Sequence, residues 1–481
     1  MVLQGCEKIR RKREIDYNAP LMSVPNATES SKRAALVIAA ASSFITPFMG
    51  SAINIGLPAV GAEFQIDAVL LSWVETVYLL VVGVFLLPMG KLADIHGRKK
   101  FFTIGISIYI VGTILSGIAF SEYQLIAFRV IQGIGSAMIF STSIAILTSI
   151  FPPSERGKVL GISVAAVYTG LSIGPFLGGI LTEHWGWRSI FLTTVPLGLL
   201  ALVLVLVYLK GEWAEAKGEK FDIAGSIILG LALIALILGL SVIPSLLGAW
   251  LIPSGIVLLA IFIMWETRVK NPVLSLSLLA GNRTFAFSNL AALINYSATF
   301  AVTFILSLYL QYIKEMTPQQ AGTVLVVQPI LMAITSPFAG RLSDKIEPRI
   351  VSSVGMTLSV IGLIPLIFLS DTTSFPVLTI SLILLGLGFG IFSSPNTNAI
   401  MGSVEKKYYG VASAMVGTMR VIGQMLSMGT VMMLFSMIIG RVQIVEENYP
   451  QFLVSIRTAF VIFTVLCTFG IFASLARGRL R

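Results

Sequence analysis

Long apolar runs alternate with short polar connections along most of the chain. The runs cover residues 34–58, 69–90, 100–120, 123–150, 157–182, 188–209, 221–243, 248–265, 284–312, 318–340, 349–369, 375–400, 408–438 and 455–476. A helix needs about 20 residues to cross a hydrocarbon core about 30 Å thick. Because a helix also satisfies its own backbone polar groups, the pattern predicts an all-α integral membrane protein with fourteen transmembrane helices.

The composition supports a membrane protein. Of 481 residues, 56% are apolar and 12% are charged, whereas soluble domains are about 25% charged. Residues 1–33 carry a basic run but no apolar core. We therefore expect a disordered cytoplasmic tail there rather than a secretory signal.

The positive charges predict the orientation. If both termini are cytoplasmic, the cytoplasmic connections hold 27 of the 33 lysines and arginines, the other side holds four, and two lie inside apolar runs. This asymmetry follows the positive-inside rule. Topology thus explains the net charge of +10, and we expect a lipid bilayer as partner and no nucleic acid.

Two similar segments indicate a duplicated architecture. Gly90-Lys-Leu-Ala-Asp94 follows the second run, and Gly340-Arg-Leu-Ser-Asp344 follows the tenth, 250 residues later. Repeated halves are common in secondary transporters. We therefore predict four parts: the tail (1–33), a six-helix bundle (34–209), a two-helix insertion with flanking loops (210–283) and a second six-helix bundle (284–481).

Several motifs occur in order along the predicted helices. They are the loop from Gly90 to Lys100, Arg129-Val-Ile-Gln132-Gly133-Ile-Gly135, Gly170-Leu-Ser-Ile-Gly174-Pro175-Phe-Leu-Gly178-Gly179, Asn54-Ile-Gly-Leu57-Pro58 and Trp73…Tyr78. Together they resemble the major facilitator superfamily, in particular its fourteen-helix drug:proton antiporter branch. The resemblance implies alternating access, a small-molecule substrate, and a proton gradient as the energy source with no cofactor.

The sequence departs from this branch at two positions. The branch often carries an aspartate in the first helix, nine residues before the proline, and Met49 occupies that position. Ile95 stands in the signature loop where a basic residue is usual. A cation-binding role for a first-helix carboxylate therefore does not carry over to this chain.

Glu75 is the residue most informative about mechanism. Of 23 acidic residues it alone lies well inside a run, roughly 9 Å below the boundary. A carboxylate at that depth costs several kcal/mol unless it is paired or wetted, so we expect it to face the interior. It either carries the coupled proton or serves as a structural partner in a fixed ion pair.

Two polar residues lie at a similar depth to Glu75. Arg129 is its natural partner, either as part of the proton-coupling site or as a fixed counter-ion. Asn54 lies four residues before the proline of the first run. We hypothesise that the three form one polar cluster in which substrate and proton compete for the carboxylate.

Further aromatic and polar residues of the runs are candidates for the substrate cavity. With Asn54 they are Tyr78, Gln132, Phe140, Tyr168, Asn295, Tyr296, Gln328, Asn396 and Arg420. Arg420 lies near mid-membrane with no acidic residue in the second-half runs to pair with. It binds either carbonyls and the amides of Asn396 or Asn398, or an anionic group on a substrate.

Candidate gating residues fall into two groups. Gly170, Gly174 and Gly178, with the helix-bending Pro175, form a bare stripe that permits close helix packing. The resemblance implies that this helix lines the contact between halves and seals one end of the cavity, and ordinary packing is the alternative. In the signature loop, Gly90, Asp94 and Arg98 would form an ionic latch at the inner gate, repeated by Asp344 and Arg349; simple charge anchoring is the alternative.

The function expected from these features is proton-coupled efflux of hydrophobic or cationic small molecules across the cytoplasmic membrane, by a monomer and without enzymatic activity. The alternatives are export or import of one metabolite, lipid or siderophore by the same fold, and a membrane-embedded enzyme or receptor. The chain has no phosphate-binding Gly-x-x-x-x-Gly-Lys-Ser/Thr loop, which disfavours an ATP-driven pump.

Overall fold

The computed structural model describes residues 29–478 apart from 152, 210, 275–278, 280, 406 and 407. This part of the chain is helical and contains no strand. Fourteen of its helical segments are long and apolar enough to cross a membrane, which confirms the predicted number of spans. Residues 1–28, most of the expected tail, lie outside the described residues.

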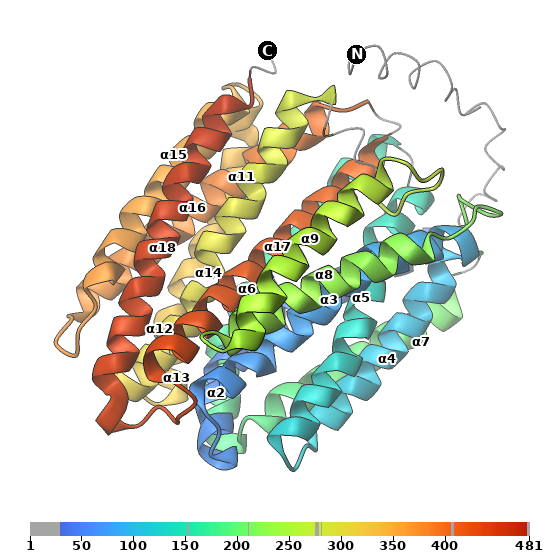
Figure 1. The fold of residues 1–481 in the computed structure, drawn as a ribbon. Helices are drawn as coiled ribbons and strands as arrows, with labels where there is room; N and C mark the ends of the chain where they lie inside the picture. Colours follow the sequence, from blue (N-terminus) through green and yellow to red (C-terminus); the bar gives the residue numbers. More distant parts are fainter. Residues whose placement is uncertain are drawn as a thin grey trace.

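The first six spans pack against one another as one bundle, the amino half (Figure 1). They are α2 (Glu29–Phe64), α3 (Ala68–His96), α4 (Arg98–Gly117), α5 (Glu122–Ile150), α6 (Pro153–Trp185) and α7 (Arg188–Tyr208). The first helix begins five residues before the predicted run, since polar residues at a membrane edge can still continue a helix. A sequence pattern shows the apolar part of a span better than its ends.

The last six spans form the carboxy half, in which several spans contain a change of helix type. They are α11 (Arg283–Thr299), α12 (Ala301–Leu308) and η1 (Tyr309–Ile313); α13 (Pro318–Leu325) and α14 (Val327–Ser343); α15 (Pro348–Leu363) and η2 (Ile364–Phe368); α16 (Phe375–Gly402); α17 (Tyr409–Leu434) and η4 (Phe435–Ile439); and η5 (Glu446–Asn448) and α18 (Tyr449–Ala476). The last long helix begins six residues before the predicted run, with Pro450 in its first turn, where proline fits a helix well.

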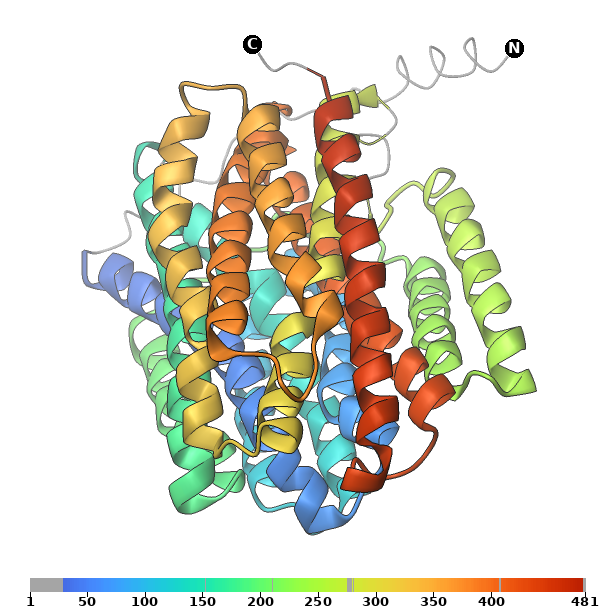
Figure 2. The ribbon, with the colours of Figure 1, turned by 90° about the vertical axis from the view of Figure 1, so that its left-hand side faces the viewer.

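The two remaining spans are an addition at the side of the bundles. Helices α8 (Ile223–Val242) and α9 (Leu246–Glu266) pack on each other, and α8 contacts α3 and α17. Figure 2 shows the pair at one edge of the molecule, with α9 outermost. The pair thus packs beside the bundles through α8.

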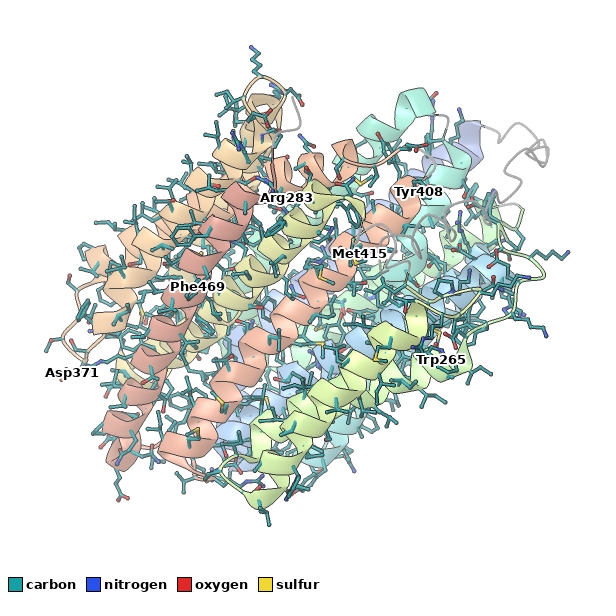
Figure 3. All side chains as sticks on the ribbon, turned by 45° about the horizontal axis from the view of Figure 1, so that its top comes forward. Trp265, Arg283, Asp371, Tyr408, Met415 and Phe469 are labelled. Atoms are coloured by element: carbon teal, nitrogen blue, oxygen red, sulfur yellow. The ribbon has the colours of Figure 1, made fainter. Side chains whose placement is uncertain are left out.

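The outward faces of the helices are apolar, as a bilayer requires. Phe469 on α18 is 62% exposed and Trp265 near the end of α9 is 40% exposed. Figure 3 shows both on the outside of the bundle, while Asp371 lies in a connecting segment at one end. Because the number of spans is even, α2 begins and α18 ends at the same face, called the terminal face below; the other end is the opposite face.

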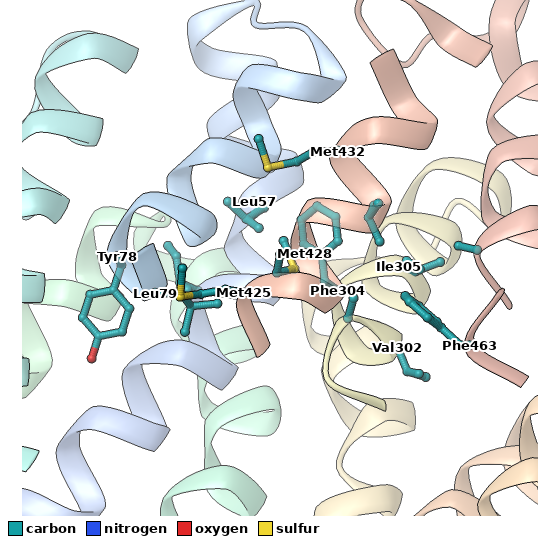
Figure 4. Close-up of a cluster of buried hydrophobic side chains, with 14 of the residues drawn as sticks. Leu57, Tyr78, Leu79, Val302, Phe304, Ile305, Met425, Met428, Met432 and Phe463 are labelled. Carbon is teal, nitrogen blue, oxygen red and sulfur yellow. The ribbon is translucent and has the colours of Figure 1, made fainter. Parts of the chain in front are cut away.

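Methionines of α17 line a seam between the halves. Met425, Met428 and Met432 are buried in the main apolar core. Figure 4 shows Met425 beside Leu79 of α3, and Met428 close to Leu57 of α2. Methionine is unbranched and adapts to irregular neighbours, so this seam can repack when the halves move against each other.

Candidate functional site

A buried ion pair lies inside the amino half. Glu75 of α3 and Arg129 of α5 are 1% and 0% exposed, and Arg129 Nη2 donates to Glu75 Oε2 at 2.7 Å. Both residues lie about two helical turns from the opposite face, because α3 and α5 both begin there. The structure therefore brings together the two charges that share a depth in the sequence.

The other two guanidinium nitrogens of Arg129 also donate hydrogen bonds. Its Nε donates to the Val74 carbonyl at 3.0 Å, and Nη1 donates to Gln132 Oε1 at 2.7 Å. Gln132 in turn donates to the Thr113 hydroxyl at 2.8 Å. The guanidinium also lies 4.3 Å from the centre of the Tyr78 ring, a cation–π contact. The cluster is closed by protein groups on every side.

Asn54 does not join the hydrogen bonds of this cluster. Glu75 faces α2 at Gly50, where an added Cβ would lie 3.6 Å from Oε1. Asn54 lies one turn further along α2, its carbonyl accepts from the Ser307 hydroxyl of the carboxy half, and its Oδ1 has no partner within the described residues. Of the three residues in the hypothesised cluster, Glu75 and Arg129 form an ion pair, and Asn54 lies nearby without joining their hydrogen bonds.

Aromatic residues from both halves meet near the centre of the molecule. Tyr296 of α11 packs edge-on against Phe389 of α16, with ring centres 5.3 Å apart. The Tyr168 hydroxyl of α6 donates to Ser393 at 3.3 Å and accepts from Ser336 at 3.3 Å. Arg420 of α17 lies over the ring of Phe140, 5.6 Å from its centre. These are the predicted cavity residues that the fold places at the contact between halves.

The expected contacts of Arg420 with asparagines are wrong. Asn396 Oδ1 accepts from Arg477 at 2.8 Å, and Asn396 Nδ2 donates to the Ser288 carbonyl. Asn398 donates to the Ser343 hydroxyl at 2.8 Å. Arg477 directly follows α18 and folds back into the carboxy half, where it is 1% exposed. Arg477, rather than Arg420, therefore contacts Asn396.

Three predicted cavity residues are sealed within the carboxy half. Asn295, Gln328 and Asn396 are 0%, 6% and 2% exposed. Both side-chain polar atoms of Asn295 and the Oε1 of Gln328 have no hydrogen-bond partner within the described residues. Burying polar groups without hydrogen-bond partners is energetically costly, so these three residues do not line an open cavity in this structure.

The glycine stripe of α6 packs within its own half. Added Cβ atoms at Gly170 and Gly178 would lie 2.5 Å from the Phe44 carbonyl and 2.8 Å from Ala52, both in α2. These two glycines thus show the ordinary packing that was the alternative to a gating role. They let α2 and α6 approach closely, because any side chain would overlap the partner backbone.

The neighbouring residues of α6 make the contact with the other half. An added Cβ at Gly179 would lie 2.5 Å from the Pro318 carbonyl, and one at Gly322 would lie 2.2 Å from the Pro175 carbonyl. Both contacts join α6 to α13 at the opposite face. Within this motif, Gly170 and Gly178 therefore pack inside the amino half, whereas Pro175 and Gly179 form a close contact with the carboxy half.

The hydrogen bonds between the halves have an uneven distribution. Within the described residues they join Ser307 to Asn54, Gln311 to Ile55, Gln319 to Glu183, Ala68 to Val442, Gln443 to Gln65, and Tyr168 to Ser393 and Ser336. Those involving Tyr168 lie near mid-membrane and the others lie toward the opposite face. None of this set is near the terminal face, so the described structure is closed at the opposite face.

The signature loop forms the expected ion pair and a further one. Arg98 Nε donates to Asp94 Oδ1 at 2.7 Å, and its Nη1 and Nη2 donate to both oxygens of Glu215 at 2.7 and 2.9 Å. Lys91 pairs with Glu219 at 2.6 Å. Glu212 accepts from the backbone of α4 at Lys99 and Lys100. The segment between α7 and α8 thus supplies three acids to this loop.

Glycine is needed at the turn between α3 and α4. Gly97 has φ of 120°, and an added Cβ would lie 2.4 Å from the Glu212 carboxyl carbon. Gly90 and Gly340 occupy matching positions in the halves, where an added Cβ would meet Ser141 at 3.4 Å and Ser394 at 2.6 Å. Both repeats thus use glycine for close helix packing beside the loop.

The two signature-like segments differ in their local geometry. In the first, Arg98 and Asp94 form an ion pair at 2.7 Å. Asp94 lies near the end of α3 and Arg98 begins α4, so the first pair, four positions apart, spans the turn at Gly97. Asp344 and Arg349 are five positions apart and span the longer connection between α14 and α15, with Pro348 as the first residue of α15. The echo of the latch at Asp344 and Arg349 stays a prediction.

Two features were not predicted from the sequence. The first is the pairing of the acids between α7 and α8 with the signature loop, and the second is the burial of Arg477 within the carboxy half. Glu212, Glu215 and Glu219 recur at three- and four-residue spacing close to the basic loop in the predicted topology, which was a usable signal. Burial lowers the pKa of Arg477 to about 10. Its position beyond the last apolar run gave no such signal.

Fourteen spans in two similar halves, with a buried ion pair in one half and aromatic residues at the contact between the halves, are typical of a secondary membrane transporter. The profile of the Major Facilitator Superfamily matches residues 39–285 and 288–479. The chain belongs to the major facilitator superfamily.

Curated relatives share most of their length with the chain. It is 30% identical over 385 residues to the riboflavin transporter RibZ of Clostridioides difficile, covering 80% of the chain and 84% of RibZ. It is 30% identical to the multidrug resistance protein Stp of Mycobacterium tuberculosis, covering 77% and 70%. It is 29% identical to multidrug resistance protein 3 of Bacillus subtilis, covering 74% and 70%.

A solved structure has the same fold. It is a bacterial homologue of the human lysosomal transporter Spinster in an inward-facing, unoccupied conformation, with a TM-score of 0.67 and 16% identity, covering 94% of the chain and 97% of that protein.

Proposed function

We propose that this protein exports small molecules across the cell membrane in exchange for protons, as a monomer that needs no cofactor. The observation that carries the proposal is the ion pair between Glu75 and Arg129, 2.7 Å long and closed off from solvent. Charge distribution places the terminal face in the cytoplasm, so a conformation closed at the opposite face can load substrate from inside.

The ion pair supports proton coupling for a physical reason. Removing one charge from a buried pair leaves the other uncompensated, which is costly. Protonation of Glu75 would therefore release Arg129 to its other partners, Val74 and Gln132, and change the balance between conformations. Proton binding thereby becomes linked to the movement of the halves.

Export is supported by two observations. The α6 segment resembles the antiporter motif, and several relatives are named multidrug resistance proteins. Transport of a single metabolite is the second candidate, because another relative is named a riboflavin transporter. A panel that includes riboflavin and several hydrophobic dyes separates the two candidates.

The test uses purified protein in liposomes with an imposed pH gradient. We expect Glu75→Gln to slow gradient-driven transport at least tenfold while substrate exchange without a gradient continues. The matched control is Glu63→Gln, which removes an exposed ion pair with Arg188 and should stay within twofold of the unchanged protein. Gradient-driven transport at the normal rate by Glu75→Gln would refute the proposal.

A further inference from the structure

One face of α17 is polar from near its start to its middle. Ser413, Gly417, Arg420 and Gln424 recur at intervals of four, three and four residues, which places them on one side of the helix. All four are partly exposed. A stripe of this kind facing lipid would be costly, so it belongs to the interior of a transporter.

The two neighbouring faces of α17 are occupied by protein. Met425 meets α3 at Gly83, where an added Cβ would lie 2.5 Å from its sulfur. Gly423 meets α11, where an added Cβ would lie 2.7 Å from Tyr296 Cβ. At Gly417 an added Cβ would find nothing within 4 Å. The polar face therefore borders open space, one turn from Arg420 toward the terminal face.

Arg420 is a charge without an acidic partner. Within the described residues its guanidinium has no ion pair or side-chain hydrogen bond, and its contact is the ring of Phe140. Five N–H donors of a guanidinium remain for water or a ligand.

The deep charges of the two halves do not balance. Glu75 and Arg129 neutralise each other, which leaves the charge of Arg420 as the excess in the middle of the membrane. A cationic compound entering this space is repelled, whereas an anionic compound is attracted.

We propose that Arg420 recognises a negatively charged group on an aromatic substrate. A guanidinium binds a carboxylate through two parallel hydrogen bonds and also stacks on rings. The ring of Phe140 lies against Arg420, and Tyr296 packs on Phe389 at the contact between halves, so aromatic side chains are available to pack on an aromatic body. The inference rests on the proposed transport function and replaces cationic compounds, expected from the sequence, with aromatic anions.

The test measures binding, without any gradient, to the purified full chain in detergent. Fluorescein and rhodamine 123 share a xanthene core and differ in charge, and fluorescence polarisation reports their binding. We expect fluorescein to bind at least tenfold more tightly than rhodamine 123. Arg420→Gln should weaken fluorescein binding at least tenfold, Arg420→Lys should retain part of it, and Arg441→Gln, an exposed charge at the opposite face, should leave it unchanged.

Three outcomes would overturn the inference: tighter binding of rhodamine 123 than of fluorescein by the unchanged protein, unaltered fluorescein binding by Arg420→Gln, or binding of neither dye. The first needs no variant, so misfolding of Arg420→Gln cannot hide it. Gradient-driven transport of rhodamine 123 that is lost in Glu75→Gln would support the proposed function and refute the substrate class.

Discussion

The arginines deep in the membrane have different surroundings in the amino and carboxy halves. In the amino half, Arg129 is fully buried and paired with Glu75. In the carboxy half, Arg420 is partly exposed and lies against an aromatic ring rather than an acid. Both residues are arginines near the middle of a helix bundle, so the side chain alone does not decide which arrangement occurs.

Under the proposed function, the two halves have different roles. A buried pair is stable while both charges remain, and a proton added to its acid changes that stability. An arginine that borders open space can exchange water for a ligand group. We therefore assign the proton to the amino half and the charged group of the substrate to the carboxy half.

The largest expected effect comes from breaking the amino-half pair. Arg129→Leu leaves Glu75 buried without its counter-charge, which should lower the free energy of unfolding by about 3–5 kcal/mol. Unfolding of the purified protein in detergent, followed by circular dichroism, measures the loss. Glu75→Gln combined with Arg129→Leu should recover part of it, since no charge is then stranded. Full stability of the single variant would show that the pair is not needed in the fold.

An intermediate effect is expected from reversing the charge in the carboxy half. Arg420→Glu should exchange the ligand preference, so that rhodamine 123 binds about tenfold more tightly than fluorescein, a change of about 1.4 kcal/mol in each binding free energy. Gln424→Glu is the matched control, because it adds an acid one turn away and keeps Arg420. If both variants change the preference equally, net charge rather than position of the arginine governs recognition.

The smallest effect should come from the acids between α7 and α8, which form ion pairs at the surface of the amino half. Glu215 is 65% exposed, and Arg98 keeps Asp94 when Glu215 is lost. Glu215→Gln should therefore cost at most about 1 kcal/mol, and less at high salt. Thermal unfolding at two salt concentrations measures this. A loss as large as that of Arg129→Leu would make the linker a structural part of the half.

Features that depend on one helix at a time were predictable from the sequence. The spans followed from apolar length, and the repeat followed from two similar loops. The pairing of Glu75 with Arg129 was predictable because depth along each helix sets which charges lie at one level, and a bilayer strongly favours pairing of charges within it.

The sequence by itself determined that the chain crosses a membrane fourteen times, in two related halves, with one acid and two arginines at depth. Only the tertiary structure decided that the glycine stripe packs against α2, that Arg477 donates a hydrogen bond to Asn396, and that Arg420 borders open space. The reason is geometric: hydrophobicity specifies how deep a residue lies, whereas the rotation and packing of each helix specify what lies beside it.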